Sequence, residues 1–397
     1  MTEYILALHP AIESCGSHDP SAVIFSDGEL VFGIEEERLI REKHAPGTFP
    51  IRAVRACLTH CGISLAAVDR VLIPWQPRDW RVIQRIGRRL SGVGTPVPPI
   101  ETYNHHRCHA ASALFPSEFE EALVLTIDGR GIGDSTVVWH GKGDGLERVR
   151  TYETPNSLGY LYAAVTGYLG YRIFDGEGTV MALAPYGKSN PEIESIFETV
   201  ISTGVEYDVR QVVGGGIPSA IARLEALFDR SRSVGVGVDD SWATDLAYAV
   251  QALTEEIVVA IVESYCERLA ISTVCLAGGV ALNCKLNKAV ADSPAVEQLF
   301  VQPVAHDAGS PIGAGMLASR KNEINTVFLG PSFSNVEIEK LLVRRGITYE
   351  RPSDLACEVA TRLADGAIIG WFQGRTEMGP RALGNRSILA DPRRANT

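Results

Sequence analysis

Two copies of one pattern, a strand followed by a glycine turn and a second strand, constrain the fold of this chain most. The first copy has apolar runs at residues 4–8 and 21–25, and Asp27-Gly28 signals a hairpin turn. The second copy starts with the apolar run 122–127, which Asp128-Gly129 closes before another strand. Helical stretches follow each copy. The repetition therefore predicts a duplicated α/β fold.

A third glycine signature supports this duplication. The longest helical pattern, residues 241–269, leads into STVCLAGGVALN (272–283), where a buried-type strand runs into Gly278-Gly279. Glycine at a strand end lets the backbone approach a phosphate closely. Three glycine turns in this order are typical of the actin-like, ribonuclease-H-like superfamily, which binds ATP between two halves. We expect one such domain over residues 1–350, with halves of about 1–120 and 121–350.

Composition restricts the partners. The chain is 45% apolar and 21% charged, and its formal net charge is −11, which is ordinary for a globular enzyme and argues against a nucleic-acid partner. Its densest basic stretch, Arg81 to Arg89, has the spacing of a solvated helix face. Neither a leader peptide nor an apolar run of membrane-spanning length is visible, and the eight cysteines are scattered. We expect a cytoplasmic protein with reduced thiols and no membrane partner.

A pair of histidines suggests a metal site. In the stretch NHHRCHAASALF, His105 and His109 lie one helical turn apart, which suits two ligands to one ion. Asp128 ends the strand that follows and offers an oxygen ligand. Two histidines and a carboxylate suit iron, manganese or zinc. The alternative is that these histidines are ordinary polar or capping groups, but the neighbouring DGRG turn favours ligands.

Other candidate side chains have two interpretations each. Asp307 follows the apolar strand LFVQP, so it either reaches a cleft, with His306 beside it, or caps the helix over 309–319. His18 and Lys43 flank the first glycine turn. A histidine there suits proton abstraction and a lysine suits charge neutralisation, although spacing alone favours a surface position for both.

The C-terminal part has a different character. A helix pattern at 337–346 and a strand pattern at 364–372 precede a stretch rich in arginine and glycine. We expect residues 351–397 to begin a second α/β domain that the chain does not complete. The stretches 75–103 and 189–240 are the most irregular, and we expect them to shape the acceptor pocket.

Several strings together resemble the carbamoyltransferases that modify nodulation factors and antibiotics. They are HDPSA (18–22), EEERLIREKHAPGTFP (35–50), HHRCHAASA (105–113), DGRGIGDST (128–136), EGTVMALAPYG (177–187), LAGGVALN (276–283), HDAGSPIGA (306–314) and GRTEMGPRALGNRSILADPR (374–393). The resemblance implies an ATP- and metal-dependent O-carbamoyltransferase. Carbamoyl phosphate and ATP would give carbamoyl-adenylate in a smaller C-terminal domain, similar to threonylcarbamoyl-adenylate synthase. The carbamoyl group would then pass to a small-molecule hydroxyl, for example of an antibiotic.

The resemblance also implies roles for individual residues. The metal, iron first among the choices, would be held by His105, His109, Asp128 and Asp307. His18 and Lys43 would line the transfer site. The nucleotide, with Mg²⁺, would contact the residues Asp128, Gly129, Gly131, Gly278, Gly279, Asn283, Arg375, Arg381 and Arg386. Because family members continue past the ADPR string, we expect this chain by itself to retain the transfer step and to lack efficient adenylation.

Three other functions are weighed against this one. A tRNA threonylcarbamoyl-transfer enzyme shares the fold, but the APYG and ALGNRSIL strings and the acidic charge argue against it. A small-molecule kinase of the actin-like superfamily needs a catalytic aspartate and Mg²⁺ but not the paired histidines. A non-catalytic nucleotide-binding module would have no need for the complete set of ligand candidates.

Overall fold

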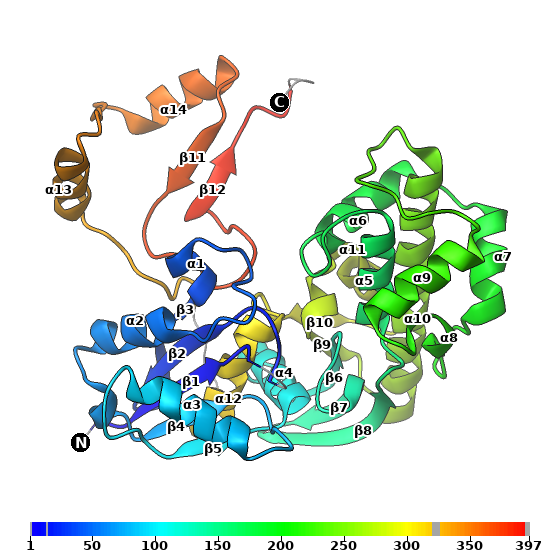
Figure 1. Ribbon diagram of the computed structural model, residues 1–397, viewed down its shortest axis with the longest axis horizontal. Coiled ribbons are helices and arrows are strands. Elements are labelled where there is room, and N and C mark those ends of the chain that lie inside the picture. The colour runs from blue at the N-terminus through cyan, green and yellow to red at the C-terminus, as the bar shows by residue number, and fades with distance from the viewer. Residues whose placement is uncertain (1, 13–14, 320–325, 394–397) are drawn as a thin grey trace.

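Two five-stranded sheets of the same topology form the centre of the molecule (Figure 1). The computed structural model describes residues 2–12, 15–319 and 326–393. The first sheet has the order β3-β2-β1-β4-β5 and the second has the order β8-β7-β6-β9-β10. In each sheet three consecutive antiparallel strands are extended by two parallel ones. This shared order confirms the duplicated actin-like α/β fold.

The strands of the first sheet are β1 (Tyr4–His9), β2 (Ser21–Ser26), β3 (Glu29–Glu35), β4 (Arg70–Ile73) and β5 (Ile100–Thr102). Those of the second are β6 (Glu121–Ile127), β7 (Asp134–Lys142), β8 (Gly145–Glu153), β9 (Thr273–Ala277) and β10 (Gln298–Val301). The helices up to the second sheet are α1 (Glu36–Ile40), α2 (Ile51–Cys61), α3 (Arg81–Ser91) and α4 (His105–Leu114). The later helices are α5 (Leu158–Tyr168), α6 (Glu177–Leu183), α7 (Pro191–Val200), α8 (Arg210–Val213), α9 (Ile217–Leu227), α10 (Ser241–Leu269), α11 (Cys284–Ala291) and α12 (Ser310–Ser319).

Alternating side chains of β1 bury both faces of the first sheet, as the period of two in a strand requires. Leu6 and Leu8 pack into the core beneath α2 and α3. Ile5 and Ala7 point the other way and pack against α12. A sheet covered on both faces reads as a continuous apolar run, which is why YILAL shows no alternation.

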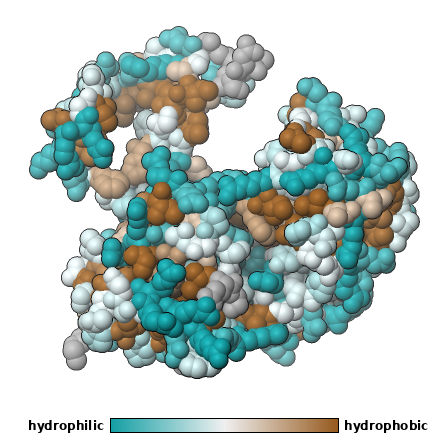
Figure 2. Space-filling view, viewed as in Figure 1, coloured by the Kyte–Doolittle hydropathy of each residue, from teal (hydrophilic) through white to brown (hydrophobic). Residues whose placement is uncertain are grey.

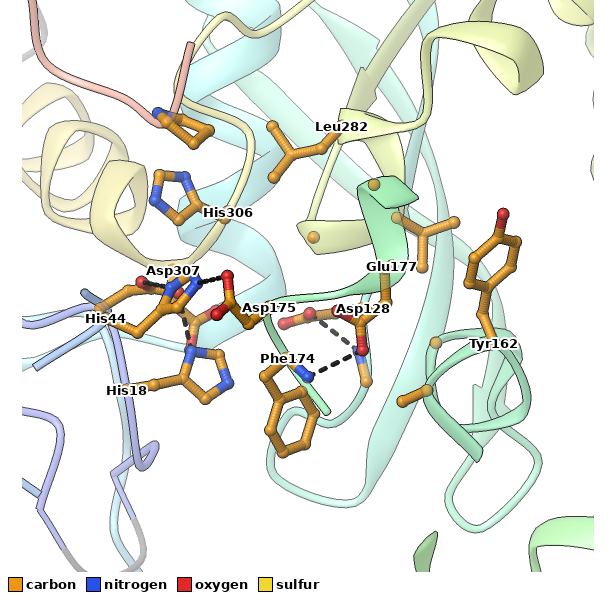
Figure 3. Close-up of a pocket in the computed structure, with 18 of the residues that line it drawn as sticks. His18, His44, Asp128, Tyr162, Phe174, Asp175, Glu177, Leu282, His306 and Asp307 are labelled. Carbon is orange, nitrogen blue, oxygen red and sulfur yellow. Dashed lines mark hydrogen bonds and ion pairs between the residues drawn. The ribbon is translucent and has the colours of Figure 1, made fainter. Parts of the chain in front are cut away.

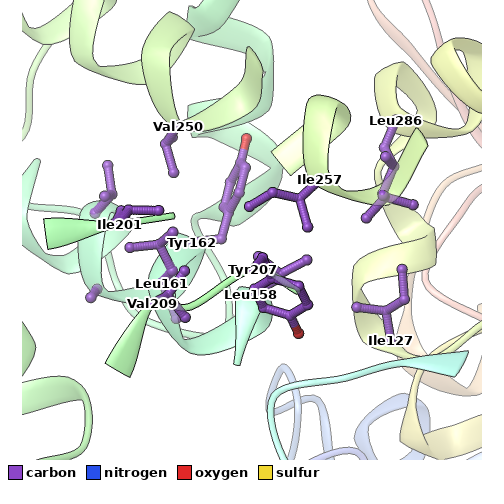
Figure 4. Packing of buried hydrophobic residues seen from close by; sticks show 14 of the residues in the cluster. Ile127, Leu158, Leu161, Tyr162, Ile201, Tyr207, Val209, Val250, Ile257 and Leu286 are labelled. Carbon is purple, nitrogen blue, oxygen red and sulfur yellow. The ribbon is translucent and has the colours of Figure 1, made fainter. Parts of the chain in front are cut away.

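The second half has the larger core, formed where α5 and α10 cover β6 (Figure 4). Tyr162 of α5 packs there with Val250 and Ile257 of α10. Helices α7, α8 and α9 also bury apolar side chains in this core. The interpretation of residues 189–240 as irregular was therefore wrong. The helices there are short and bounded by Pro and Gly, which weakens their periodic signal.

The two halves exchange helices. Helix α4 follows the first sheet along the chain but packs against β6 and β9, whereas α12 follows the second sheet and packs against β1 and β2. The two helices also touch closely, because a Cβ placed on Gly313 would lie 1.8 Å from the carbonyl oxygen of Cys108. This crossing brings the N-terminus of α4 and the start of α12 to the junction of the halves.

The C-terminal segment comprises α13 (Asn335–Arg345), α14 (Leu355–Ala364), β11 (Ile369–Phe372) and β12 (Arg386–Leu389). Neither helix has a buried residue, and hydrophobic side chains are visible on the surface of this segment in Figure 2. The strand expected over 364–372 is confined to its last four residues, because α14 continues to Ala364. Across the described part of the chain, no helix combines the length and apolar character needed to span a bilayer.

Candidate functional site

Four predicted ligand side chains converge at the junction of the two halves. His105 Nε2 lies 3.0 Å from Asp128 Oδ2 and 3.4 Å from Asp307 Oδ1. His109 Nε2 lies 3.2 Å from His105 Nε2, 3.5 Å from Asp307 Oδ1 and 3.8 Å from Asp128 Oδ2. One ligand atom from each of the four residues falls within 4.8 Å of the others.

These separations suit a single metal ion. Nitrogen and oxygen atoms bound at about 2.0–2.2 Å to one ion lie roughly 3 to 3.6 Å apart. Two imidazoles and two carboxylates match the ligand preferences of iron, manganese and zinc. The residues present therefore form a possible metal site.

The local structure explains why the four side chains meet. The Asn104 side chain caps α4 by accepting the N–H of Arg107, which starts the helix at His105 and puts His105 and His109 on one face. Asp128 directly follows β6. Asp307 opens the short 3-10 helix Asp307–Gly309 before α12, and its carboxylate faces the histidines instead of capping the helix.

A second layer of residues supports the ligands. His105 Nδ1 lies 3.3 Å from the carbonyl oxygen of Pro74, and the ring of Trp75 packs 4.3 Å from the His105 ring. His9, which is fully buried at the end of β1, places its Nε2 3.5 Å from Asp307 Oδ2. Such outer contacts orient metal ligands in many proteins. The sequence reasoning missed His9, whose only signal was its position at a strand end.

The electrostatics of the cluster also favour a cation. Burial by itself lowers the pKa of His105, but the charges of Asp307 and Asp128 and their hydrogen bonds outweigh it and raise that pKa to about 10. Without a cation, the carboxylates thus hold a proton on the imidazole. A metal ion would replace this proton, since only the neutral ring nitrogen is a ligand.

A cavity of about 340 Å³ opens above the ligand cluster (Figure 3). Asp128 and Asp307 line it together with the backbone turns at Gly129 and Gly279, which come from the second half. The volume is in the range of small-molecule sites. Its further lining residues of functional interest are His18, Lys43, His44, Phe174, Asp175, Asn283, His306 and Arg381.

The predicted glycines take different positions. Gly129 and Gly279 line the cavity, whereas Gly278 supports it from behind, with a left-handed φ of +90° and no room for a side chain beside Ile127. Gly131 does not line the cavity. A Cβ on Gly131 would lie 2.4 Å from Asp134 and 2.6 Å from the ring of His106, so packing explains this glycine.

The predicted arginines do not form one cluster. Arg381 lines the cavity and donates to the carbonyl of Leu282 at 3.0 Å. Arg375 instead donates to backbone carbonyls, among them that of Gly330, and Arg386 donates to that of Gly379. In this structure Arg375 therefore links the C-terminal segment to the first half through the carbonyl of Val31, whereas the hydrogen bonds of Arg386 lie within the C-terminal segment.

Three polar residues of the first half, His18, Asp19 and His44, line the cavity and are hydrogen-bonded to one another. Asp19 accepts a hydrogen bond from Nδ1 of His18 and another from Nδ1 of His44, both at 2.7 Å. Asp19 and His44 both have left-handed backbones, with φ of +58° and +60°. Such strain in non-glycine residues is common at functional sites. Asp19 was not among the predicted residues, and its adjacency to His18 was the only available signal.

The same network sets the charge of His18. Burial lowers the pKa of His18, but the hydrogen bond and the charge of Asp19 outweigh it and raise the pKa to about 9. Burial raises the pKa of the Asp19 carboxyl, but the charge of His306 and the hydrogen bonds from His18 and His44 outweigh it and hold that pKa far below the usual range, so Asp19 stays ionised.

Most of the cavity wall comes from outside the two stretches that were expected to shape an acceptor pocket. Tyr160 and Tyr162 of α5, the loop with Phe174, and Met181 of α6 line the cavity. Of the stretches 75–103 and 189–240, only the first contributes a lining residue, Trp75. The stretch 189–240 does not line this cavity, because its helices pack into the core with α5 and α10.

Comparison with known proteins gives two family matches. The profile described as "Carbamoyltransferase N-terminus" matches residues 75–316, and that described as "Carbamoyltransferase C-terminus" matches residues 360–397. An uncharacterized protein of Synechocystis sp. is 33% identical, with 95% of this chain and 70% of that protein covered. Nodulation protein NolNO of Sinorhizobium fredii is 36% identical, with 95% and 59% covered. Nodulation protein NolO of Bradyrhizobium diazoefficiens is 35% identical, with 74% and 54% covered.

Solved structures show weaker likenesses. Component A of the (R)-2-hydroxyglutaryl-CoA dehydratase of Acidaminococcus fermentans aligns with a TM-score of 0.48 and 15% identity, over 81% of this chain and 99% of that one. HypF of T. kodakarensis aligns with a TM-score of 0.45 and 15% identity, over 80% and 47%. The assignment of the fold rests on the strand order of the two sheets and not on these likenesses.

Proposed function

Because this chain belongs to the carbamoyltransferase family, we propose that its cavity transfers a carbamoyl group from carbamoyl-adenylate to the hydroxyl of a small molecule. The adenylate would be formed from carbamoyl phosphate and ATP. One observation carries the proposal. A possible metal site, two glycine turns and His18, which is hydrogen-bonded to Asp19, share one cavity. Because the chain spans 59% of NolNO and 54% of NolO, the activity of the whole protein is part of this proposal.

The glycine turns suit the nucleotide. Gly129 and Gly279 line the cavity, and glycine turns of this kind bind phosphate oxygens; in this structure the Gly129 N–H donates to Oδ1 of Asp128 at 2.8 Å. Asn283 lines the same side, where its side-chain amide bonds to Gln251 and accepts the Leu286 N–H, and the ribose would lie beside this pair. Carbamoyl-adenylate would thus extend from these turns toward the ligand cluster. ATP would enter this site with its Mg²⁺.

His105, His109, Asp128 and Asp307 would hold a divalent metal, which we propose to be iron, with manganese and zinc as the alternatives. When bound, the ion would supply Lewis-acid polarisation of the carbonyl and neutralise phosphate charge. The residues of the chain do the remaining work, by orienting the adenylate, excluding water and handling the acceptor's proton.

His18 is the proposed general base. Asp19 accepts the Nδ1–H of His18, so in the neutral form of the ring the free electron pair lies on Nε2. As the acceptor oxygen bonds to the carbamoyl carbon, its proton moves to His18 Nε2, and AMP leaves with the electron pair of the anhydride C–O bond. Lys43, also at the cavity, would neutralise the charge that develops on the oxygens.

The test is mass spectrometry after incubation of the chain with a panel of hydroxylated natural products. One arm receives carbamoyl phosphate and ATP, and the other receives preformed carbamoyl-adenylate. We expect a carbamoylated product in the second arm, and none with the His18→Ala variant. If the wild-type chain formed a phosphorylated product instead, a kinase function would replace this proposal.

A further inference from the structure

The loop over residues 171–176, between α5 and α6, crosses from the second half to the first. The Asp175 carboxylate forms an ion pair with the ammonium group of Lys43, and its Oδ1 lies 3.6 Å from Nε2 of His44. The ring of the neighbouring Phe174 lies 4.8 Å from the ring of His18, centroid to centroid (Figure 3). One short loop thus contacts three of the polar residues that the first half places at the cavity.

The backbone of this loop is strained at Phe174. Its φ is +64°, a left-handed conformation that bulky side chains rarely adopt. The Phe174 N–H donates to Oε1 of Glu177 at 2.8 Å, which helps to hold the turn. Burial does not explain the strain, because 40% of Phe174 is exposed. This conformation directs the Phe174 ring at His18 and the Asp175 carboxylate at Lys43.

The ion pair alone would contribute little. The Lys43 side chain is 62% exposed, and exposed ion pairs are weak. The Asp175 side chain is only 23% exposed, and its charge also interacts with His44. Burial raises the pKa of the Asp175 carboxyl, but the hydrogen bond and charge of Lys43 outweigh it and lower that pKa. The Asp175 carboxylate is therefore ionised at neutral pH, and its position depends on Lys43 and His44 of the first half.

We propose that Asp175 and Phe174 are positioning residues that join the two halves of the cleft over the reacting groups. Asp175 fixes Lys43 and His44, and Phe174 covers His18 against water. The inference rests on the proposed carbamoyl transfer. It assigns these residues a role in the choice between two fates of carbamoyl-adenylate, because water competes with the acceptor for the same carbonyl carbon.

Both fates break the same anhydride C–O bond and release AMP. Attack by the acceptor oxygen gives the carbamoylated product, whereas attack by water gives carbamate. The ratio of carbamoylated product to AMP therefore measures how well the cleft excludes water. A loop that no longer contacts the first half should lower this ratio.

The experiment measures this ratio for variants of the full chain supplied with carbamoyl-adenylate and acceptor. Asp175→Asn removes the charge at nearly constant size, and we expect the ratio to fall about tenfold. Asp175→Glu keeps the charge and should restore part of the loss. Phe174→Gly should lower the ratio without lowering Tm, because glycine adopts the left-handed backbone freely. Asp292→Asn is the control, since it breaks the exposed Lys288–Asp292 pair at the C-terminal end of α11. Unchanged ratios in both Asp175→Asn and Phe174→Gly would overturn the proposal.

A second measurement does not depend on the reaction. Hydrogen exchange of the amides over residues 171–176 should be faster in Asp175→Asn than in the wild-type chain and unchanged in Asp292→Asn. Equal exchange in all three proteins would overturn the cross-cleft role of Asp175. If exchange differed but the wild-type chain consumed no carbamoyl-adenylate, the proposed function would fail while the structural role of Asp175 remained.

Discussion

The imidazole of His105, on the first turn of α4, lies 3.0 Å from the carboxylate of Asp128, at the end of β6. This contact exists because α4 leaves the first sheet and packs against the second. The exchange of helices thus builds the ligand cluster. His105 on α4 and Asp128 after β6 therefore meet where the ends of the helix and the strand lie together.

The first prediction concerns metal content. Replacing His105 or His109 with alanine should weaken binding of Fe²⁺ or Zn²⁺ by at least about 100-fold, because loss of a direct ligand should exceed the effect of losing an outer contact. Metal stoichiometry by elemental analysis after desalting would measure this. His140→Ala is the matched control, since His140 pairs with Glu121 on the second sheet away from the cluster. Retention of a full equivalent of metal by His105→Ala would remove this site from the proposal.

The second prediction concerns His9. Its Nε2 lies 3.5 Å from Asp307 Oδ2. Burial lowers the pKa of His9 to about 4, so the ring is neutral and can interact with Asp307 only as a hydrogen-bond donor and not as a cation. Replacement by leucine should leave Asp307 less well oriented and weaken metal binding by roughly 10–100-fold. Competition with a chelator of known affinity would measure the change. Identical affinities would show that Asp307 needs no support from His9.

The third prediction concerns pH. The pKa of His18 is raised to about 9, so the neutral base is scarce at pH 7 and increases as the pH rises. The transfer rate should therefore increase up to about tenfold per pH unit and level off near pH 9. The charges of Asp307 and Asp128 contribute to this raised pKa, so a bound cation that offsets them should move the midpoint lower.

Asp19→Asn tests the cause of this pH dependence. Removing the charge should lower the pKa of His18, move the midpoint to lower pH and reduce kcat more than it raises KM, since the imidazole loses its fixed tautomer. The pH profile of kcat should not shift in Asp292→Asn. If Asp19→Asn left the midpoint in place, another group would be the base.

The sequence predicted the features whose pattern lies within one short stretch of the chain. The helical spacing of His105 and His109 and the strand end at Asp128 are local, and the duplicated fold followed from repeated apolar runs and turns. Asp19, Asp175 and Phe174 could not be identified in this way, because their roles come from contacts across the cleft and from left-handed backbones. Residue type alone was also ambiguous. Glycine serves packing at position 131, and arginine binds backbone carbonyls at 375 and 386.

The last prediction concerns the crossing of α4 and α12. A methyl group added at Gly313 would lie 1.8 Å from the Cys108 carbonyl oxygen and 3.0 Å from the Ser112 nitrogen, both backbone atoms of α4 that cannot rotate away. Gly313→Ala should therefore separate the helices and lower the free energy of unfolding by at least about 2 kcal/mol. Since α4 carries both histidines and Asp307 precedes α12, metal affinity should fall as well. Gly237→Ala is the control, because nothing lies within 4 Å of its added Cβ. Denaturant titration and chelator competition on the same samples would show both effects. A Gly313→Ala variant with reduced stability but unchanged metal affinity would show that the ligand cluster does not depend on this helix crossing.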